Sequence, residues 1–200
     1  MVTALIAAAA LSLQAPTIHM SITTDGKQVG EAFLTQKLEG GVKKTHAKLI
    51  LGSVRIVETA EYSMDGTPKS KAMVRTANNQ EERIEAVFLK DGVKVTGPGG
   101  GVTVDIPTRG TLQAKSEFWF IQTKPPINHS VVYQRFDLGT RKFVECKVTF
   151  VGREEITSGG AKVVANRVKV DGTTDAWLDA RGDPIRMVLK GGTRFERLAK

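Results

Sequence analysis

After residue 16, hydrophobic and polar residues alternate with a period of two along most of the chain. A period of two places successive side chains on opposite faces of an extended strand, and no full window shows a helical repeat. The pattern therefore predicts an all-β protein. The alternating segments are residues 48–51, 53–59, 71–76, 84–89, 93–96, 102–106, 142–151, 161–170 and 185–189.

Glycine-containing dipeptides separate these segments. They favour positive φ angles and close tight hairpins. A sheet of about 10–13 hairpin-linked antiparallel strands curls under its own twist. We therefore expect a single highly curved antiparallel sheet, a half-barrel or open barrel. The dipeptides are Asp25-Gly26, Gly40-Gly41, Asp65-Gly66, Asp91-Gly92 and Asp171-Gly172.

One stretch, between Thr108 and His129, interrupts the alternation. Its centre carries Phe118, Trp119, Phe120 and Ile121 in a row, and two prolines follow soon after. Prolines continue neither a helix nor a central strand, so we expect a short helical or irregular segment near residues 112–124. Curled antiparallel sheets enclose either their own side chains or an apolar ligand. The four apolar residues are therefore the expected ligand-binding lid.

The sequence does not determine which face of each strand points toward the interior. Val144, Cys146, Val148 and Phe150 share one face, where Cys146 is most simply a small core residue. Several other strands carry apolar residues on both faces, which is typical when one face meets a ligand or plug and the other meets a partner.

The first 15 residues read as a targeting segment. Met1 to Ala15 contain no charged side chain and form an apolar run too short to span a bilayer. We expect a signal peptide over 1–15, cleaved near Ser12 or Ala15, although the basic residue usual at its start is absent. A hydrophobic helix or first strand docked on the core is the alternative. Residues 16–200 would form one soluble domain, periplasmic or extracellular, because no later run could span a membrane.

Composition narrows the chemistry. The chain of 200 residues has 29 Lys and Arg against 21 Asp and Glu, a formal charge of +8, and one cysteine. A single cysteine excludes an intrachain disulfide and a multi-cysteine zinc site. The cationic residues are dispersed among acidic residues without interleaved aromatics, which argues against nucleic-acid binding. The net positive charge would still attract the protein weakly to anionic envelope surfaces.

No catalytic motif is present, and we expect neither a catalytic residue, a metal nor a cofactor. The nucleophile elbow Gly-x-Ser-x-Gly, Ser-x-x-Lys and His-Glu-x-x-His do not occur. His19, His46 and His129 lie far apart, and none is paired at a metal-ligand spacing. Three aspartates, Asp175, Asp179 and Asp183, are expected to be surface acids rather than a catalytic pair.

Two short stretches carry a family resemblance. Gln28-Val-Gly-Glu-Ala-Phe33 and the meander Trp177–Leu189 resemble exported bacterial proteins of uncharacterised function, which are related in fold to the outer-membrane lipoprotein carriers. The resemblance implies a curved sheet with an apolar concave face covered by a short helical segment, a fold associated with binding acyl chains or lipidated proteins. It carries over no catalytic residue.

Three functions follow as hypotheses. The first is an exported, non-enzymatic protein that binds a lipid or lipidated protein on the concave face of the sheet. The alternative to this hypothesis is a structural module, in which the chain's own side chains fill the inner face. The second is an envelope module that docks a partner by a sheet edge, and the third is an uncharacterised hydrolase.

Overall fold

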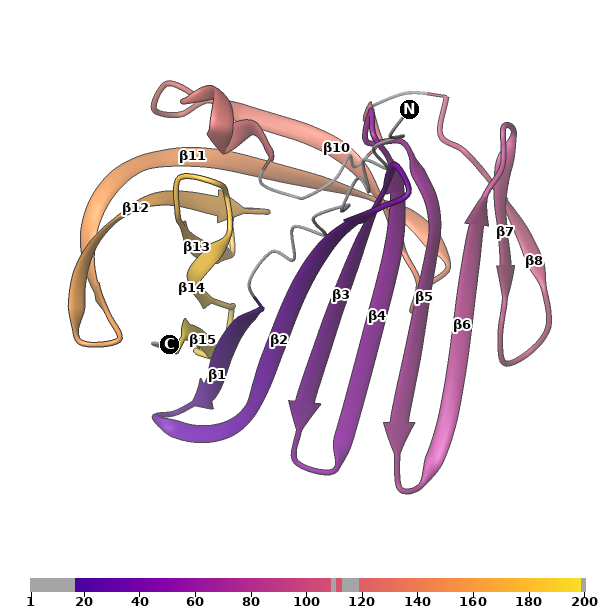
Figure 1. Cartoon of the computed structure of the whole chain (residues 1–200), viewed down its shortest axis with the longest axis horizontal. Helices are drawn as coiled ribbons and strands as arrows, with labels where there is room; N and C mark the ends of the chain where they lie inside the picture. The colour runs from indigo at the N-terminus through magenta and orange to yellow at the C-terminus, as the bar shows by residue number, and fades with distance from the viewer. Residues whose placement is uncertain (1–16, 109–110, 113–118, 199–200) are drawn as a thin grey trace, which may run out of the picture.

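A computed structural model describes residues 17–108, 111–112 and 119–198. The expected signal peptide over residues 1–15 therefore lies outside the described residues, as does Phe118. The first half of the described chain forms a meander of hairpins (Figure 1). Its strands are β1 (Ile18–Thr24), β2 (Lys27–Glu39), β3 (Val42–Leu51), β4 (Val54–Ser63), β5 (Pro68–Ala77), β6 (Gln80–Phe88), β7 (Gly92–Thr96) and β8 (Val102–Asp105).

The second half begins with a very short strand and the only helical segment that the structure describes. The rest is again a meander, in which the long strand β11 bends strongly around the molecule (Figure 1). Its elements are β9 (Thr111–Leu112), the 3-10 helix η1 (Trp119–Thr123), β10 (Ser130–Asp137), β11 (Lys142–Ser158), β12 (Ala161–Val170), β13 (Thr174–Leu178), β14 (Pro184–Val188) and β15 (Arg194–Arg197).

All described strands belong to one sheet, in the order β8-β7-β6-β5-β4-β3-β2-β1-β15-β14-β13-β12-β11-β10-β9. Every neighbouring pair is antiparallel except β9 and β10, which run parallel over two residues. No ladder among the described strands joins the two ends, β8 and β9, so the sheet is not closed into a barrel. The expected all-β, highly curved antiparallel sheet is confirmed. The described residues form more strands than expected because elements as short as β9 and β15 carry too few residues to show alternation.

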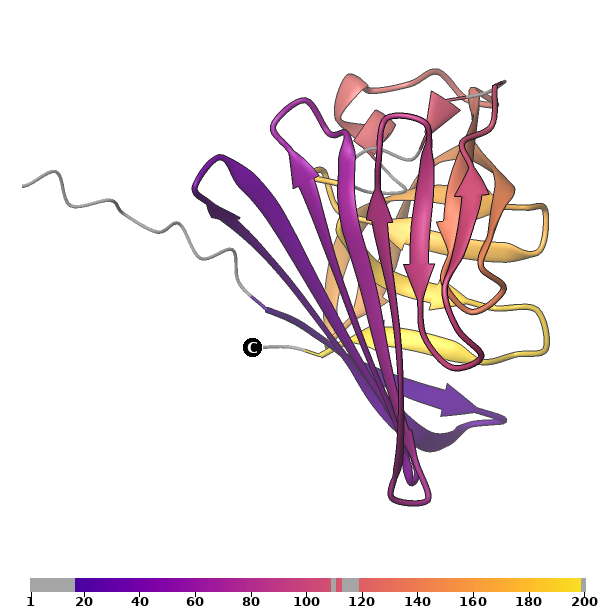
Figure 2. The ribbon, with the colours of Figure 1, turned by 90° about the vertical axis from the view of Figure 1, so that its right-hand side faces the viewer.

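The inner face of the sheet is set by the alternation. Residues paired across a ladder share a face, and one continuous row runs from Ile22 through Phe195, Met187 and Ala176 to Val168. Ile22, Ala176 and Val168 in this row are fully buried. Figure 2 shows how this face is enclosed, with β1 to β8 forming one wall and β10 to β15 the other.

The two ends of the sheet overlap. Phe136 and Phe143 are paired in the β10–β11 ladder and lie on the opposite face from Cys146 and Val148, which makes that face the outer one. These outer phenylalanines pack against the inner face of β6 and β7, where Ala86 is fully buried. The sheet is therefore a roll, in which the β5–β8 end covers the outside of the β10–β11 end.

Candidate functional site: a plugged apolar interior

The inner wall of the second half is a continuous apolar surface. It is formed by alternate residues of β10 to β13, and every member is buried. Val131, Val170 and Met187 extend it with partly buried side chains. We call this surface the inner wall. Its buried residues are Tyr133, Cys146, Val148, Phe150, Val168, Ala176 and Leu178.

The helix η1 lies against the inner wall. Phe120 is 4% exposed and Ile121 is 3% exposed, and both belong to the same hydrophobic cluster as the wall. Two local hydrogen bonds hold the turn, from Lys124 N to the Ile121 carbonyl at 3.0 Å and from Thr123 Oγ1 to the Phe120 carbonyl at 2.6 Å. The helix thus fills the interior with two side chains. We call Phe120 and Ile121 the plug.

The chain after the plug is tied to the wall through its backbone. Asn128 N donates to the Phe150 carbonyl and Phe150 N donates to the His129 carbonyl, both at 2.8 Å. Together with Lys124-Pro125-Pro126, these bonds anchor the connection into β10. The plug therefore sits beside a fixed point of β11, and the apolar contacts of its side chains hold it on the wall.

The four expected lid residues do not share one location. Phe120 and Ile121 lie inside the roll, Trp119 begins η1, and Phe118 lies outside the described residues. Cys146 is 1% exposed on the inner wall, which confirms it as a small core residue.

A second apolar cluster lines the inner face at the middle of the sheet. Met20, Ile22 and Ala32 of β1 and β2 are buried there, and Phe195 of β15 packs against them. Because Phe195 pairs with Met187, which packs on the inner wall, the two apolar surfaces adjoin along β14 and β15. The inner face is thus apolar from β2 around to β10.

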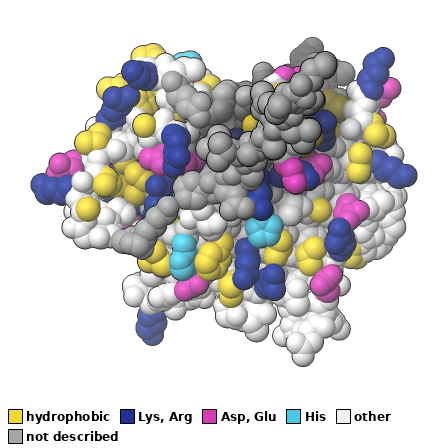
Figure 3. All heavy atoms as spheres, viewed as in Figure 1, with side chains coloured by type: hydrophobic (Ala, Val, Ile, Leu, Met, Phe, Trp, Pro, Cys, Tyr) yellow, Lys and Arg dark blue, Asp and Glu magenta, His cyan; other side chains and the backbone are white. Residues whose placement is uncertain are grey.

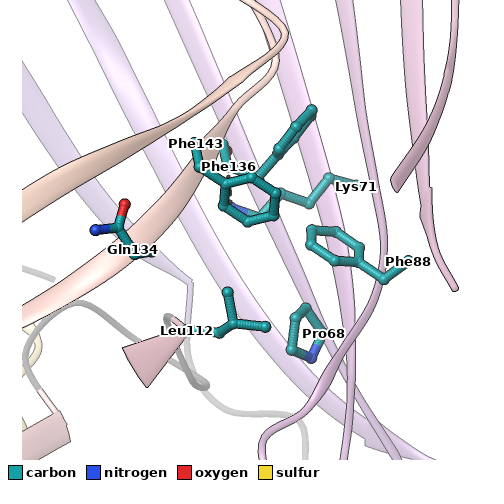
Figure 4. A pocket seen from close by; sticks show the side chains of 7 residues that line it. All are labelled: Pro68, Lys71, Phe88, Leu112, Gln134, Phe136 and Phe143. Carbon is teal, nitrogen blue, oxygen red and sulfur yellow. Dashed lines mark hydrogen bonds between the residues drawn. The ribbon is translucent and has the colours of Figure 1, made fainter. Parts of the chain in front are cut away.

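The seam where the two ends of the sheet overlap was not anticipated from the sequence. Phe136 meets Phe88 edge-on at 5.9 Å between ring centroids and Phe143 at 5.1 Å (Figure 4). A void of about 10 Å³, close to the size of one water molecule, remains between these rings, Lys71 and Leu112. Lys71 Nζ donates to the Phe136 carbonyl across the seam at 3.4 Å. The available signal was that Phe136 and Phe143 fall on the face opposite to Val144, Cys146 and Val148.

A larger hollow, of about 800 Å³, is lined mainly by polar outer-face residues of β2 to β5. Lys44 lies 3.2 Å from Glu39 and 3.5 Å from Glu61, and its hydrogen bond and charge attraction to Glu39 above all raise the pKa of its ammonium group. Figure 3 shows charges of both signs, histidines and hydrophobic side chains mixed over this side of the molecule. Such a surface is typical of a solvated face and does not suit an apolar chain.

The histidine and aspartate residues considered in the sequence analysis include three that contact neighbouring side chains or backbone. His19 stacks on Phe33 at 4.3 Å on the outer face and lies 3.2 Å from Glu31. Asp175 pairs with Arg167 at 3.0 Å. Asp179 accepts hydrogen bonds from backbone N–H groups of the turn that follows it. In the segments that the structure describes, no group of three or more His, Cys, Asp or Glu side chains is placed to hold a metal ion. The same segments contain no helix with the length and hydrophobicity to cross a bilayer.

The class of protein defined by these features is an all-β protein with one rolled sheet around an apolar, plugged interior. Its fold is similar to the crystal structure of a beta-barrel-like protein of the domain of unknown function DUF1849 from Brucella abortus. The two match with a TM-score of 0.57 at 12% sequence identity, over 94% of this chain and 98% of that chain. No protein-family model matches the sequence, and no curated protein matches it. The likeness therefore defines the fold and leaves the function to be argued from the interior.

Proposed function

We propose that this protein is an exported, non-enzymatic carrier that binds one acyl chain, free or attached to a lipid or lipidated protein, on the inner wall in the place of the plug. Phe120 and Ile121 act as the displaceable plug, and Phe118 and Trp119 complete the lid. The expected signal peptide supports the export part of this proposal.

The burial of the plug carries the proposal. Two large apolar side chains from a five-residue 3-10 helix lie within a wall made of seven buried residues. A short 3-10 turn has poor intrinsic stability, so its position depends on these side-chain contacts. An apolar chain that made the same contacts would replace it at little backbone cost.

The energetics favour such an exchange. Burying a large apolar side chain contributes about 1.5–3 kcal/mol, so the plug contributes roughly 3–6 kcal/mol. An acyl chain contributes about 0.8 kcal/mol for each buried methylene, so about ten methylenes supply roughly 8 kcal/mol. A chain of ordinary length can therefore outcompete the plug without a special polar contact.

The test is a titration of the purified protein with dansyl-undecanoic acid, whose emission shifts to the blue when its fluorophore leaves water. We expect saturable binding by the wild type. Phe120→Ala shortens the plug, so it should lower the unfolding midpoint in urea and raise the affinity for the probe. A plug with a purely structural role would lose stability without any gain in affinity.

Ile127→Ala is the matched control. Ile127 follows η1 closely in the chain and is 66% exposed, so its truncation should change neither stability nor affinity. Trp177→Phe leaves Trp119 as the single tryptophan, and its emission then reports on η1 while unlabelled fatty acid is added. An absence of both the dansyl shift and any Trp119 response would contradict the proposed function.

A further inference from the structure

We infer that the seam between the two overlapping ends of the sheet is the gate through which the ligand reaches the inner wall. This inference rests on the proposed function and adds the route that the ligand takes. It places the opening between β5–β8 on one side and β9–β11 on the other.

The seam differs from the rest of the sheet in its backbone hydrogen bonds. Each neighbouring strand pair from β8 around to β9 is joined by a ladder. The overlap is different, because no ladder among the described strands connects β5, β6, β7 or β8 with β9, β10 or β11. Opening the roll at any other line would break a ladder, whereas opening it at the seam separates packed side chains and hydrogen bonds that side chains donate to backbone carbonyls.

The described polar contacts across the seam are made by long cationic side chains. Lys71 donates to the Phe136 carbonyl at 3.4 Å. Arg141, in the β10–β11 turn, donates to the Pro98 carbonyl and to the Gly100 carbonyl in the β7–β8 loop, the latter at 3.5 Å. Long cationic side chains that reach backbone carbonyls can release and re-form these bonds without refolding any element.

The seam and the plug are close to each other in the sequence. Leu112 of β9 lines the void at the seam, and the two described residues of β9 pair with Tyr133 and Gln134 of β10. Trp119, seven positions after Leu112 in the chain, begins η1. Strand β9 therefore lies at the seam and close to the plug in the sequence, so the seam and the plug are covalently linked over a short length of chain.

The experiment locks the seam reversibly. Pro98→Cys with Arg141→Cys places one thiol on each side, and a short bismaleimide with a reducible disulfide in its spacer joins them. The native Cys146 is 1% exposed and stays out of this reaction. Stopped-flow mixing with dansyl-undecanoic acid then measures the rates of uptake and release.

We expect the linked protein to take up and release the probe more slowly than the unlinked double variant by about tenfold or more, and the rates of the unlinked double variant to return when the spacer is reduced. Arg141→Ala should have the opposite effect and speed both rates by about fivefold with little change in affinity. Arg55→Ala is the control, because Arg55 is exposed on the outer face of β4, away from the seam.

The outcomes separate the gate from the function. If the linked protein binds the probe as fast as the reduced one, the gate lies elsewhere and the carrier proposal stands. If the unlinked and wild-type proteins do not bind the probe at all, the proposed function itself is wrong. A link that changes only one of the two rates, and with it the affinity, would also overturn the gate.

Discussion

Arg197 in the last strand is bonded to Asp179 in the turn between β13 and β14. Both terminal nitrogens of the Arg197 guanidinium lie 3.2 Å from Asp179 Oδ2, and its Nε donates to the Pro184 carbonyl at 2.8 Å. The other carboxylate oxygen of Asp179 accepts the backbone N–H groups of Arg181 at 2.9 Å and Asp183 at 3.0 Å. One carboxylate thus shapes the turn and ties it to β15.

We expect Asp179→Ala to lower the free energy of unfolding by about 2 kcal/mol, because it leaves partly buried donors of Arg197 and the turn without their acceptor. Urea unfolding followed by circular dichroism measures this change. Arg181→Ala is the control, since the Arg181 side chain is 63% exposed and its loss should change stability by less than about 0.5 kcal/mol. Equal effects of the two variants would contradict the role assigned to Asp179.

Gly30 in β2 lies where no side chain fits. A Cβ at this position would lie 2.0 Å from the Ile50 carbonyl oxygen and 2.9 Å from Leu51 Cδ2, beside an irregularity in the β1–β2 pairing. The obstacle is backbone of the neighbouring strand, so it cannot move aside as a flexible side chain would.

Gly30→Ala should therefore destabilise the protein by roughly 2 kcal/mol or more and shift the thermal midpoint downward. Gly139→Ala provides the comparison, since a Cβ there would be at an ordinary 3.5 Å from Asp137 Oδ1. We expect its thermal midpoint to stay near that of the wild type. A well-tolerated alanine at position 30 would show that β2 and β3 do not approach as closely as described.

Glu196 gives the protein a pH dependence. Burial acts to raise the pKa of its carboxyl, but hydrogen bonds from Arg186 and Arg194 outweigh that effect and lower the pKa below its usual value of 4.5. A carboxyl with a lowered folded-state pKa stabilises the fold above the unfolded-state pKa. This contribution is lost as the pH falls through the lower, folded-state value.

Urea midpoints measured from neutral pH down into the acid range test this sign. The difference in stability between wild type and Glu196→Gln should be largest at neutral pH and should shrink as Glu196 becomes protonated. Glu155→Gln, which removes an exposed acid on β11, should show no comparable convergence. A constant difference between wild type and Glu196→Gln across the range would contradict the assignment.

The alternation of Val144, Cys146, Val148 and Phe150 was enough to predict the strand and to group Cys146, Val148 and Phe150, which are the residues of β11 in the inner wall. The apolar run and the prolines that follow it also predicted a short helical or irregular segment near residues 112–124, where the structure has the helical turn Trp119–Thr123. Both signals are local, because they depend on the period of one strand or on residues a few positions apart.

The overlap of the sheet ends was beyond such reasoning. Phe136 and Phe143 meet Ala86 and Val93, which come from the other half of the chain. Nothing in either strand specifies which distant strand will cover an outer apolar face. The likeness noted at Trp177–Leu189 has a local cause as well, since Asp179 and Pro184 serve the turn and its contact with Arg197.

The most direct measurement of the central claim is mass spectrometry of the organic-solvent extract of the protein purified from its native host. If the inner wall binds an acyl chain in place of the plug, the extract contains an acyl-bearing molecule, in an amount approaching one per protein, that Phe120→Ala retains or increases. An extract free of such molecules, from a protein that also fails to bind dansyl-undecanoic acid, would contradict the account and leave a rolled sheet filled by its own side chains.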